Sequence, residues 1–264
     1  MELLLVELQL LEQLVVELVL VELLELGLRD MATTNSNRTR VALLIATVAA
    51  GAGVALGFGG ERIVEVVQDH PGRFVAFLAF TLFLQLFTLR VNGKGSIGLS
   101  AVGLVTAGIV LGAGPAMAIA VVAAVVQYAR RRGLLHRAAF DASNFALAAG
   151  GAAVTYAAVT DADSSTLARF AAATLAGLVY GTVNNGLLCV AMATSDGRSL
   201  VTTWQEHFSW AKLHLLAIGP LAASAAIVYD EIGIAALAVF ALPPLLVLLS
   251  MQRRLIRLVR PVHA

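Results

Sequence analysis

The sequence has few charged side chains, and this scarcity excludes most classes of soluble protein. Only 13% of its 264 residues are charged, against about 25% in typical soluble domains. Hydrophobic residues make up 59% of the chain, and the mean hydropathy is +0.86. A soluble protein of this composition could not cover its surface with polar groups, and disordered or nucleic-acid-binding chains need more charge. The composition therefore predicts a membrane protein with several spans and no nucleic-acid partner.

The sequence also has one cysteine and none of the common catalytic motifs. The single cysteine, Cys189, lies in an apolar run. Because one cysteine cannot form a disulfide framework or a cysteine metal cluster, both are excluded. No Gly-rich phosphate loop, His-Glu-x-x-His pair or Gly-x-Ser-x-Gly elbow occurs. Asp141 is the one clear acid inside a predicted span, which excludes an aspartyl dyad in a monomer. We expect no enzyme activity, no metal and no cofactor.

Residues 1–30 differ from the rest of the chain. They carry a net charge of −6, whereas residues 31–264 carry +7. Their glutamates recur every five residues, in steps of about 140° around a helix, which leaves no apolar stripe. We interpret 1–30 as a low-complexity segment that is not part of the native protein, with Met31 as the true start and 31–264 as an integral membrane domain. A surface helix or oligomerisation segment is the alternative.

The apolar runs from residue 41 onward predict an all-α, polytopic transmembrane helical bundle. A span needs about 20 mostly apolar residues. Charges and Gly/Pro residues divide the runs into eight spans, near 41–59, 74–90, 97–114, 115–130, 138–159, 170–194, 210–229 and 233–251. Six or seven spans are the alternatives, because only residues 112–115 separate 97–114 from 115–130. This pair forms either a tight hairpin of short spans or a re-entrant segment buried by its neighbours.

The placement of basic residues predicts the orientation of the bundle. With the N-terminus in the cytoplasm, 14 Lys/Arg residues fall in inside segments and only Arg62, Arg73 and Arg169 fall in outside loops. This bias follows the positive-inside rule. Both termini are therefore expected in the cytoplasm.

Three Gly-x-x-x-Gly pairs lie in the predicted spans and allow helix backbones to approach closely. Packing within the bundle is the simpler interpretation, and an interface between copies in a homo-oligomer is the alternative. The pairs are Gly53/Gly57, Gly108/Gly112 and Gly177/Gly181.

Polar side chains inside spans are costly, so they are candidates for a binding site. Two predicted spans, 138–159 and 170–194, supply them. Structural roles are the alternatives: an ion pair with Arg137 for the acid, and hydrogen bonds between helices for the amides. The candidate ligand-binding residues are Asp141, Asn144, Tyr180, Asn184 and Asn185.

A polar segment at 195–211 and a basic stretch after the last span are candidate interfaces. Residues 196–199 predict a turn, and the following residues predict an amphipathic helix at the inner membrane surface with tryptophan anchors. The arginines bind either anionic lipid, at about 1 kcal/mol each, or a partner. The candidate interface residues are Trp204, Trp210, Arg253, Arg254 and Arg257.

Several motifs between residues 90 and 255 occur in a characteristic order. They are Gly95–Ser100, Leu111–Gly112 with Gly114–Pro115, Phe140–Asn144, Val183–Asn184, Asp196–Ser199, Trp204–Trp210 and Gly219–Pro220. In this order and spacing the chain resembles the membrane sensory input modules found ahead of bacterial HD-type phosphohydrolase and GGDEF signalling domains. It departs from them at Gly98, Asp141 and Asn144, where Ser, Asn and Gln are common.

The resemblance implies a sensory or signalling role without catalysis. It also implies a multi-pass chain in the bacterial inner (plasma) membrane, with the lipid bilayer as its surroundings. The last predicted span is followed by basic residues and no output domain. We therefore expect a stand-alone module that binds a small or lipid-like ligand and acts through a cytoplasmic signalling partner. A small-molecule transporter, or its membrane substrate-binding subunit, is one alternative, suggested by the Gly/Pro-interrupted pair at 97–130. A structural membrane protein without a ligand is the other.

Overall fold

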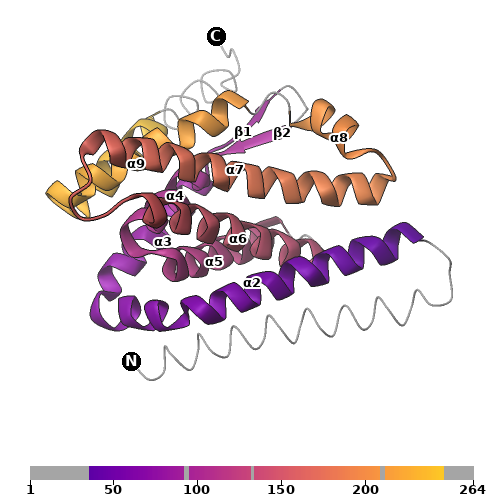
Figure 1. Cartoon of the computed structure of the whole chain (residues 1–264), viewed down its shortest axis with the longest axis horizontal. Helices are drawn as coiled ribbons and strands as arrows, with labels where there is room; N and C mark the ends of the chain where they lie inside the picture. The colour runs from indigo at the N-terminus through magenta and orange to yellow at the C-terminus, as the bar shows by residue number, and fades with distance from the viewer. Residues whose placement is uncertain (1–35, 92–94, 132–133, 209–211, 247–264) are drawn as a thin grey trace, which may run out of the picture.

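The structure, a computed structural model of the chain, describes residues 36–91, 95–131, 134–208 and 212–246 (Figure 1). The predictions about residues 1–30 and Met31 lie outside these ranges. The elements in chain order are α2 (Ser36–Asp69), α3 (Pro71–Gln85), β1 (Thr88–Val91), β2 (Gly95–Gly98), α4 (Ser100–Leu111), α5 (Ala113–Arg131), α6 (Leu135–Val159), α7 (Thr166–Asp196), α8 (Leu200–His207), α9 (Lys212–Ile232) and the helix Ala235–Leu246.

Five helices in the described ranges are long and apolar enough to cross a membrane, namely α2, α5, α6, α7 and α9. Large apolar side chains on their surfaces stay exposed, among them Phe58 at 89% and Leu167 at 80%. These findings confirm a helical membrane bundle. Each of the eight predicted spans overlaps one helix, but α3, α4 and Ala235–Leu246 have fewer than 18 residues. The count of eight and the cytoplasmic placement of the termini stay predictions.

Helix α2 continues ten residues beyond the predicted span 41–59, to Asp69. The added turns carry charged residues, and the Arg62 guanidinium pairs with the Glu65 carboxylate one turn later at 2.6 Å. His70 alone separates α2 from α3, and Pro71 is the first residue of α3. Since 34 residues extend about 51 Å and the hydrocarbon core is about 30 Å thick, α2 reaches beyond the core.

A short β-hairpin stands where the sequence predicts the end of one span and a turn. Helix α3 ends at Gln85, and Thr88–Val91 pairs antiparallel with Gly95–Gly98, so that Val91 faces Gly95. The all-α class is confirmed for the bundle, and this hairpin of two four-residue strands is a local addition to it. The β-branched residues of β1 and the glycines of β2 disfavour helix, and the pairing satisfies the backbone groups that a helix would have satisfied.

Helix α4 and helix α5 are separated by a single residue, Gly112, whose φ of +94° is readily adopted only by glycine. The next glycine, Gly114, lies where α5 crosses α2 at Gly59. A Cβ atom on Gly59 would lie 2.8 Å from the Gly114 Cα atom. Helix α4 has 12 residues, about 18 Å of helix. Most of it is buried, so its apolar side chains face neighbouring helices, and the choice between a short span and a re-entrant segment stays a prediction.

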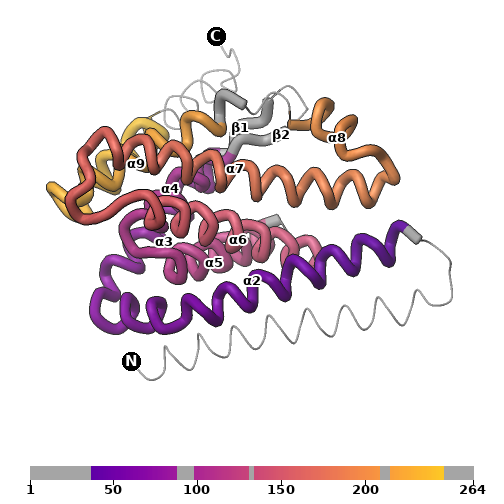
Figure 2. The backbone as a smooth tube through the Cα atoms, in the orientation of Figure 1, coloured from indigo at the N-terminus to yellow at the C-terminus, as the bar shows by residue number. Residues whose placement is uncertain are grey.

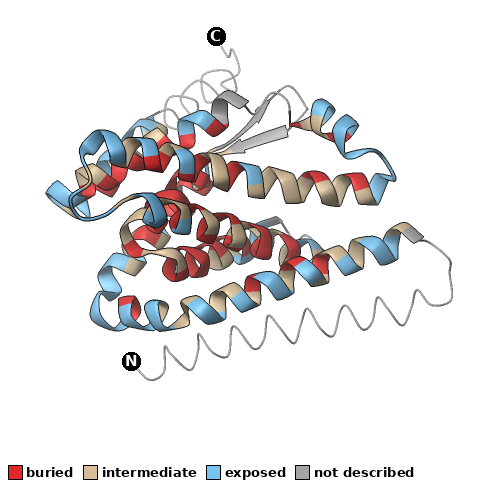
Figure 3. Cartoon of the chain, viewed as in Figure 1, coloured by how far each residue is buried: buried red, intermediate tan, exposed pale blue. Residues whose placement is uncertain are grey.

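The core lies where α3, α4, α5, α6, α7 and α9 meet. Helix α6 packs between α5 and α7, and α7 packs on α9, while α2 covers α5 and α6 from outside (Figure 2). Large side chains such as Phe77, Leu104, Ile119 and Ile218 are at most 2% exposed. Figure 3 shows buried residues along the middle helices and exposed ones along the outer side of α2.

The bundle has two ends, which are defined here by their turns. The α8 end carries the start of α2, the hairpin and α8. The other end, the pocket end, carries the turns from α2 to α3, α4 to α5, α6 to α7, and α9 to the helix Ala235–Leu246. Each long helix therefore runs from one end to the other, as the alternation of predicted loops requires.

Candidate functional site

Two helices bring predicted ligand-binding residues together inside the bundle. Asn144 on α6 is only 2% exposed. Its Nδ2 atom donates hydrogen bonds to the side-chain Oδ1 of Asn184 on α7 at 2.9 Å and to the Asn184 main-chain oxygen at 3.1 Å. The Asn184 Nδ2 atom lies 3.5 Å from the Asn185 Oδ1 and donates to it. We call Asn144, Asn184 and Asn185 the amide cluster.

The amide cluster contains a buried acceptor that the protein does not use. The Asn144 Oδ1 atom is buried and has no hydrogen-bond partner among the described residues. Leaving such an acceptor unpaired costs about 1–3 kcal/mol. A bound water or the donor group of a ligand would recover this free energy.

The other two predicted ligand residues have different surroundings. Tyr180 lies one turn before Asn184 and is 3% exposed, within the main hydrophobic cluster that also contains Leu215 and Ile218. Asp141 is half-buried and already takes part in an interaction of its own. Hydrogen bonds therefore connect the three asparagines, whereas Tyr180 lies in the apolar core one turn away.

The predicted turn at 196–199 and the helix after it are present. Helix α7 ends at Asp196 and is capped by Gly197, whose φ is +66°. The Arg198 amide donates back to the Ala193 carbonyl oxygen at 3.0 Å. The Ser199 hydroxyl then caps α8 by accepting from the Thr202 amide at 3.1 Å. Both caps are encoded locally, which is why the sequence pattern finds them.

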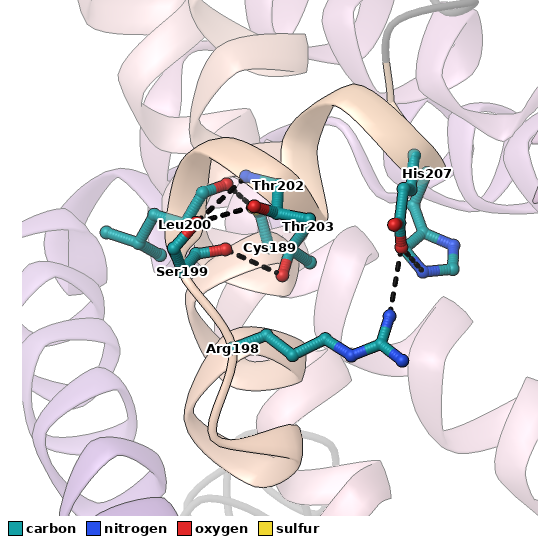
Figure 4. A network of polar contacts seen from close by, with 8 residues as sticks. Cys189, Arg198, Ser199, Leu200, Thr202, Thr203 and His207 are labelled. Atoms are coloured by element: carbon teal, nitrogen blue, oxygen red, sulfur yellow. Dashed lines mark hydrogen bonds and ion pairs between the residues drawn. The ribbon is translucent and has the colours of Figure 1, made fainter.

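Helix α8 is fastened to the end of α7 by polar contacts (Figure 4). The Arg198 Nη1 atom donates to the Glu206 Oε2 at 3.0 Å, and the Cys189 thiol donates to the Leu200 carbonyl oxygen at 3.6 Å. The predicted anchor Trp204 is half-buried and packs on Phe208, with ring centroids 5.5 Å apart. The other predicted interface residues lie outside the described residues: Trp210, Arg253, Arg254 and Arg257.

Sequence reasoning missed a pocket of about 550 Å³ at the pocket end. Helices α3, α4, α7 and α9 and the turn after α9 all contribute to it. Its lining residues are Arg73, Ile109, Val110, Arg169, Tyr229, Asp230, Gly233 and Ile234. The sequence showed the two arginines only as scattered residues of outside loops, and no spacing connects them, because they meet only when the helices assemble.

An ion pair organises the wall of this pocket. The Arg169 Nη2 atom on α7 donates to the Asp230 carboxylate on α9. Its Nε atom donates to the Tyr156 hydroxyl on α6 at 3.3 Å. Arg169 is thereby held at two points, and the guanidinium connects three helices at the pocket end.

A second polar contact that the sequence analysis did not single out joins α3 to α5. The Gln85 Nε2 atom donates to the Gln127 Oε1 at 2.5 Å and to the Ala123 carbonyl oxygen at 3.2 Å. Glutamines inside predicted spans were an available signal, because an amide in a membrane interior needs a partner. This contact ties the short helix α3 to a long one.

Among the described residues, the amide cluster leaves one buried acceptor without a partner, and the pocket lining carries two guanidinium groups and one carboxylate. Within the described part of the chain, no group of three or more His, Cys, Asp or Glu residues could hold a metal ion.

The long apolar helices indicate a helical, membrane-associated protein. The model of the MASE9 family, a family of membrane-associated sensory domains, matches residues 66–252. Because this match covers well over half of the chain, the protein belongs to the MASE9 family. No curated protein and no solved structure matches the chain.

Proposed function

We propose that the chain is a sensory input module of the bacterial inner membrane, which binds a small or lipid-like ligand in its bundle and catalyses no reaction itself. It acts through a cytoplasmic signalling partner of the HD or GGDEF type. The amide cluster supports this proposal, since a buried acceptor stands unpaired at a contact between two long helices of a sensory-family chain.

The position of the amide cluster suggests how binding could be passed on. From Asn184 to its end at Asp196, α7 continues as unbroken helix, about 18 Å long. It then carries α8 through the Arg198–Glu206 ion pair. A ligand that donates to Asn144 Oδ1 and prefers one arrangement of α6 and α7 would shift the population toward that arrangement. The shift would reach α8, where a cytoplasmic partner can bind.

The test compares a deletion strain with strains that express the wild-type chain, Asn144→Leu or Asn184→Leu. We expect the deletion to change cyclic-dinucleotide levels, the wild type to restore them and both variants to fail while remaining in the membrane. Ser143→Ala is the matched control, because the Ser143 hydroxyl bonds only to Ala139 of its own helix. Unchanged cyclic-dinucleotide levels in the deletion strain, together with a pull-down that recovers no signalling protein, would overturn the proposal.

Transport is the second candidate, and the short, buried helix α4 beside the β-hairpin favours it, since interrupted helices often mark transport sites. Accumulation of a solute inside vesicles that contain the purified protein, but not inside empty vesicles, would support transport. No accumulation would count against transport, and the strain comparison above would then distinguish the sensory module from a structural membrane protein.

A further inference from the structure

The pocket end holds a cavity whose charges are not balanced. Arg73 and Arg169 bring two positive charges to its lining and Asp230 one negative charge. Arg169 and Asp230 are hydrogen-bonded to each other. Arg73, at the start of α3, is exposed and has no ion pair within the described residues. The lining therefore has an excess of one positive charge, and Arg73 carries it.

The remaining walls of the pocket are apolar or aromatic. Ile109 and Val110 come from the end of α4, and Ile234 from the turn after α9. Tyr229 is 8% exposed and is held by the Phe77 ring, with centroids 5.0 Å apart. The lining therefore combines these apolar and aromatic side chains with two guanidinium groups and the Asp230 carboxylate. The volume of about 550 Å³ lies in the range of small-molecule sites, roughly 300–1,000 Å³.

We propose that this pocket binds a small organic anion, a carboxylate or phosphate ester with a compact apolar body, whose charged group pairs with Arg73. The apolar body lies against Ile109, Val110 and Ile234. Arg169, held by Asp230 and Tyr156, acts as a fixed second donor at the rim. Arginine suits this role because its planar guanidinium binds carboxylates and phosphates through two parallel hydrogen bonds.

The pocket also has a position that suits a sensor. It is built from α3, α4, α7 and α9, and α7 is the helix that continues to the amide cluster and α8. In the predicted orientation the pocket faces outward. The proposal goes beyond the function proposed above, since binding here is measurable whether or not the chain signals.

The experiment uses the full chain in nanodiscs of phosphatidylcholine and measures heat of binding near neutral pH. The probes are 4-methylpentanoate and its uncharged analogue 4-methylpentanamide. We expect the carboxylate to bind at least about tenfold more tightly than the amide, and Arg73→Gln to remove this preference. Arg73→Lys should restore part of it, which shows that the variant chain is folded.

Arg62→Gln is the matched control, because Arg62 lies at the same end but pairs with Glu65 and does not line the pocket. Its preference for the carboxylate should equal that of the wild type. A second arm replaces phosphatidylcholine by phosphatidylglycerol. If the anionic lipid displaces 4-methylpentanoate from the wild type, a lipid headgroup is the source of the anion, and if it does not, the source is a soluble anion. Equal affinity for carboxylate and amide, or an unchanged preference in Arg73→Gln, would overturn the proposal.

Discussion

Helices α2 and α7 carry the same Gly-x-x-x-Gly spacing in opposite surroundings. A Cβ atom on Gly177 of α7 would lie 2.5 Å from the Gly219 amide nitrogen of α9, and one on Gly181 would collide with Leu215. A Cβ atom on Gly53 or Gly57 of α2 would meet nothing within 4 Å. The spacing allows two backbones to approach closely, but a contact forms only where a second helix packs against the glycines.

The difference extends to the polar groups of the two helices. Helix α7 exchanges hydrogen bonds with α6 through Asn184 and with α9 through Arg169. On α2, the Thr47 hydroxyl donates to the Leu43 carbonyl oxygen of its own helix, and Arg62 pairs with Glu65 one turn away. Helix α7 therefore belongs to the centre of the bundle, whereas α2 covers it.

Substitution of the glycine at the closest crossing should have the largest effect on this comparison. We expect Gly177→Val to lower the free energy of unfolding by about 3 kcal/mol, since the new side chain would meet backbone atoms of α9 that cannot rotate away. The protein is unfolded in detergent, and its unfolding is monitored by the loss of the helical signal and by gel filtration.

Gly186→Val, on the same helix, is the matched control for this substitution. A Cβ atom on Gly186 would meet nothing within 4 Å, so both variants share the cost of a β-branched residue in a helix. Equal destabilisation by the two variants would show that the crossing of α7 and α9 is not as close as described.

Loss of the hydrogen bonds between Asn144 and Asn184 should have an intermediate effect on the free energy of unfolding. Asn144→Leu removes both hydrogen bonds to Asn184, and we expect a loss of about 1 kcal/mol, within the range measured for interhelical hydrogen bonds in membranes. Thr47→Val on α2 removes a bond within one helix and should change the unfolding free energy by less. A larger loss for Thr47→Val would reverse the proposed roles of the two helices.

Substitution of alanine for a glycine with free space around it should have the smallest effect on the free energy of unfolding, and this effect should be stabilising. Gly57→Ala fills no occupied space and should stabilise α2 by up to about 1 kcal/mol through helix propensity. The same unfolding titration measures it. A clear destabilisation instead would mean that another surface covers this face, as the alternative of a homo-oligomer requires.

Helix positions followed from the sequence where a local property decided them. Every predicted span overlaps a helix, and the cap at Gly197 and the start of α8 lie where the turn was expected. The end of α3 was placed five residues too late, because Leu86, Phe87 and Leu89 continue the apolar run. The pairing of Thr88–Val91 with Gly95–Gly98 depends on two segments, whereas hydropathy evaluates one segment at a time.

The candidate site was predictable only in part. Asn144 and Asn184 stood out because amides are rare in spans, although their pairing across 40 residues was not visible. The pocket was not found, since Arg169 and Asp230 are 61 residues apart and each suits a surface loop.

By itself the sequence determined that this chain is a helical membrane protein, because the free energy of moving each side chain into lipid adds along a segment and depends little on other segments. Only the tertiary structure decided which glycines lie at helix crossings, which amides meet and where a pocket with an unpaired arginine forms. Those outcomes depend on which helices become neighbours, and that choice is made by packing between distant segments.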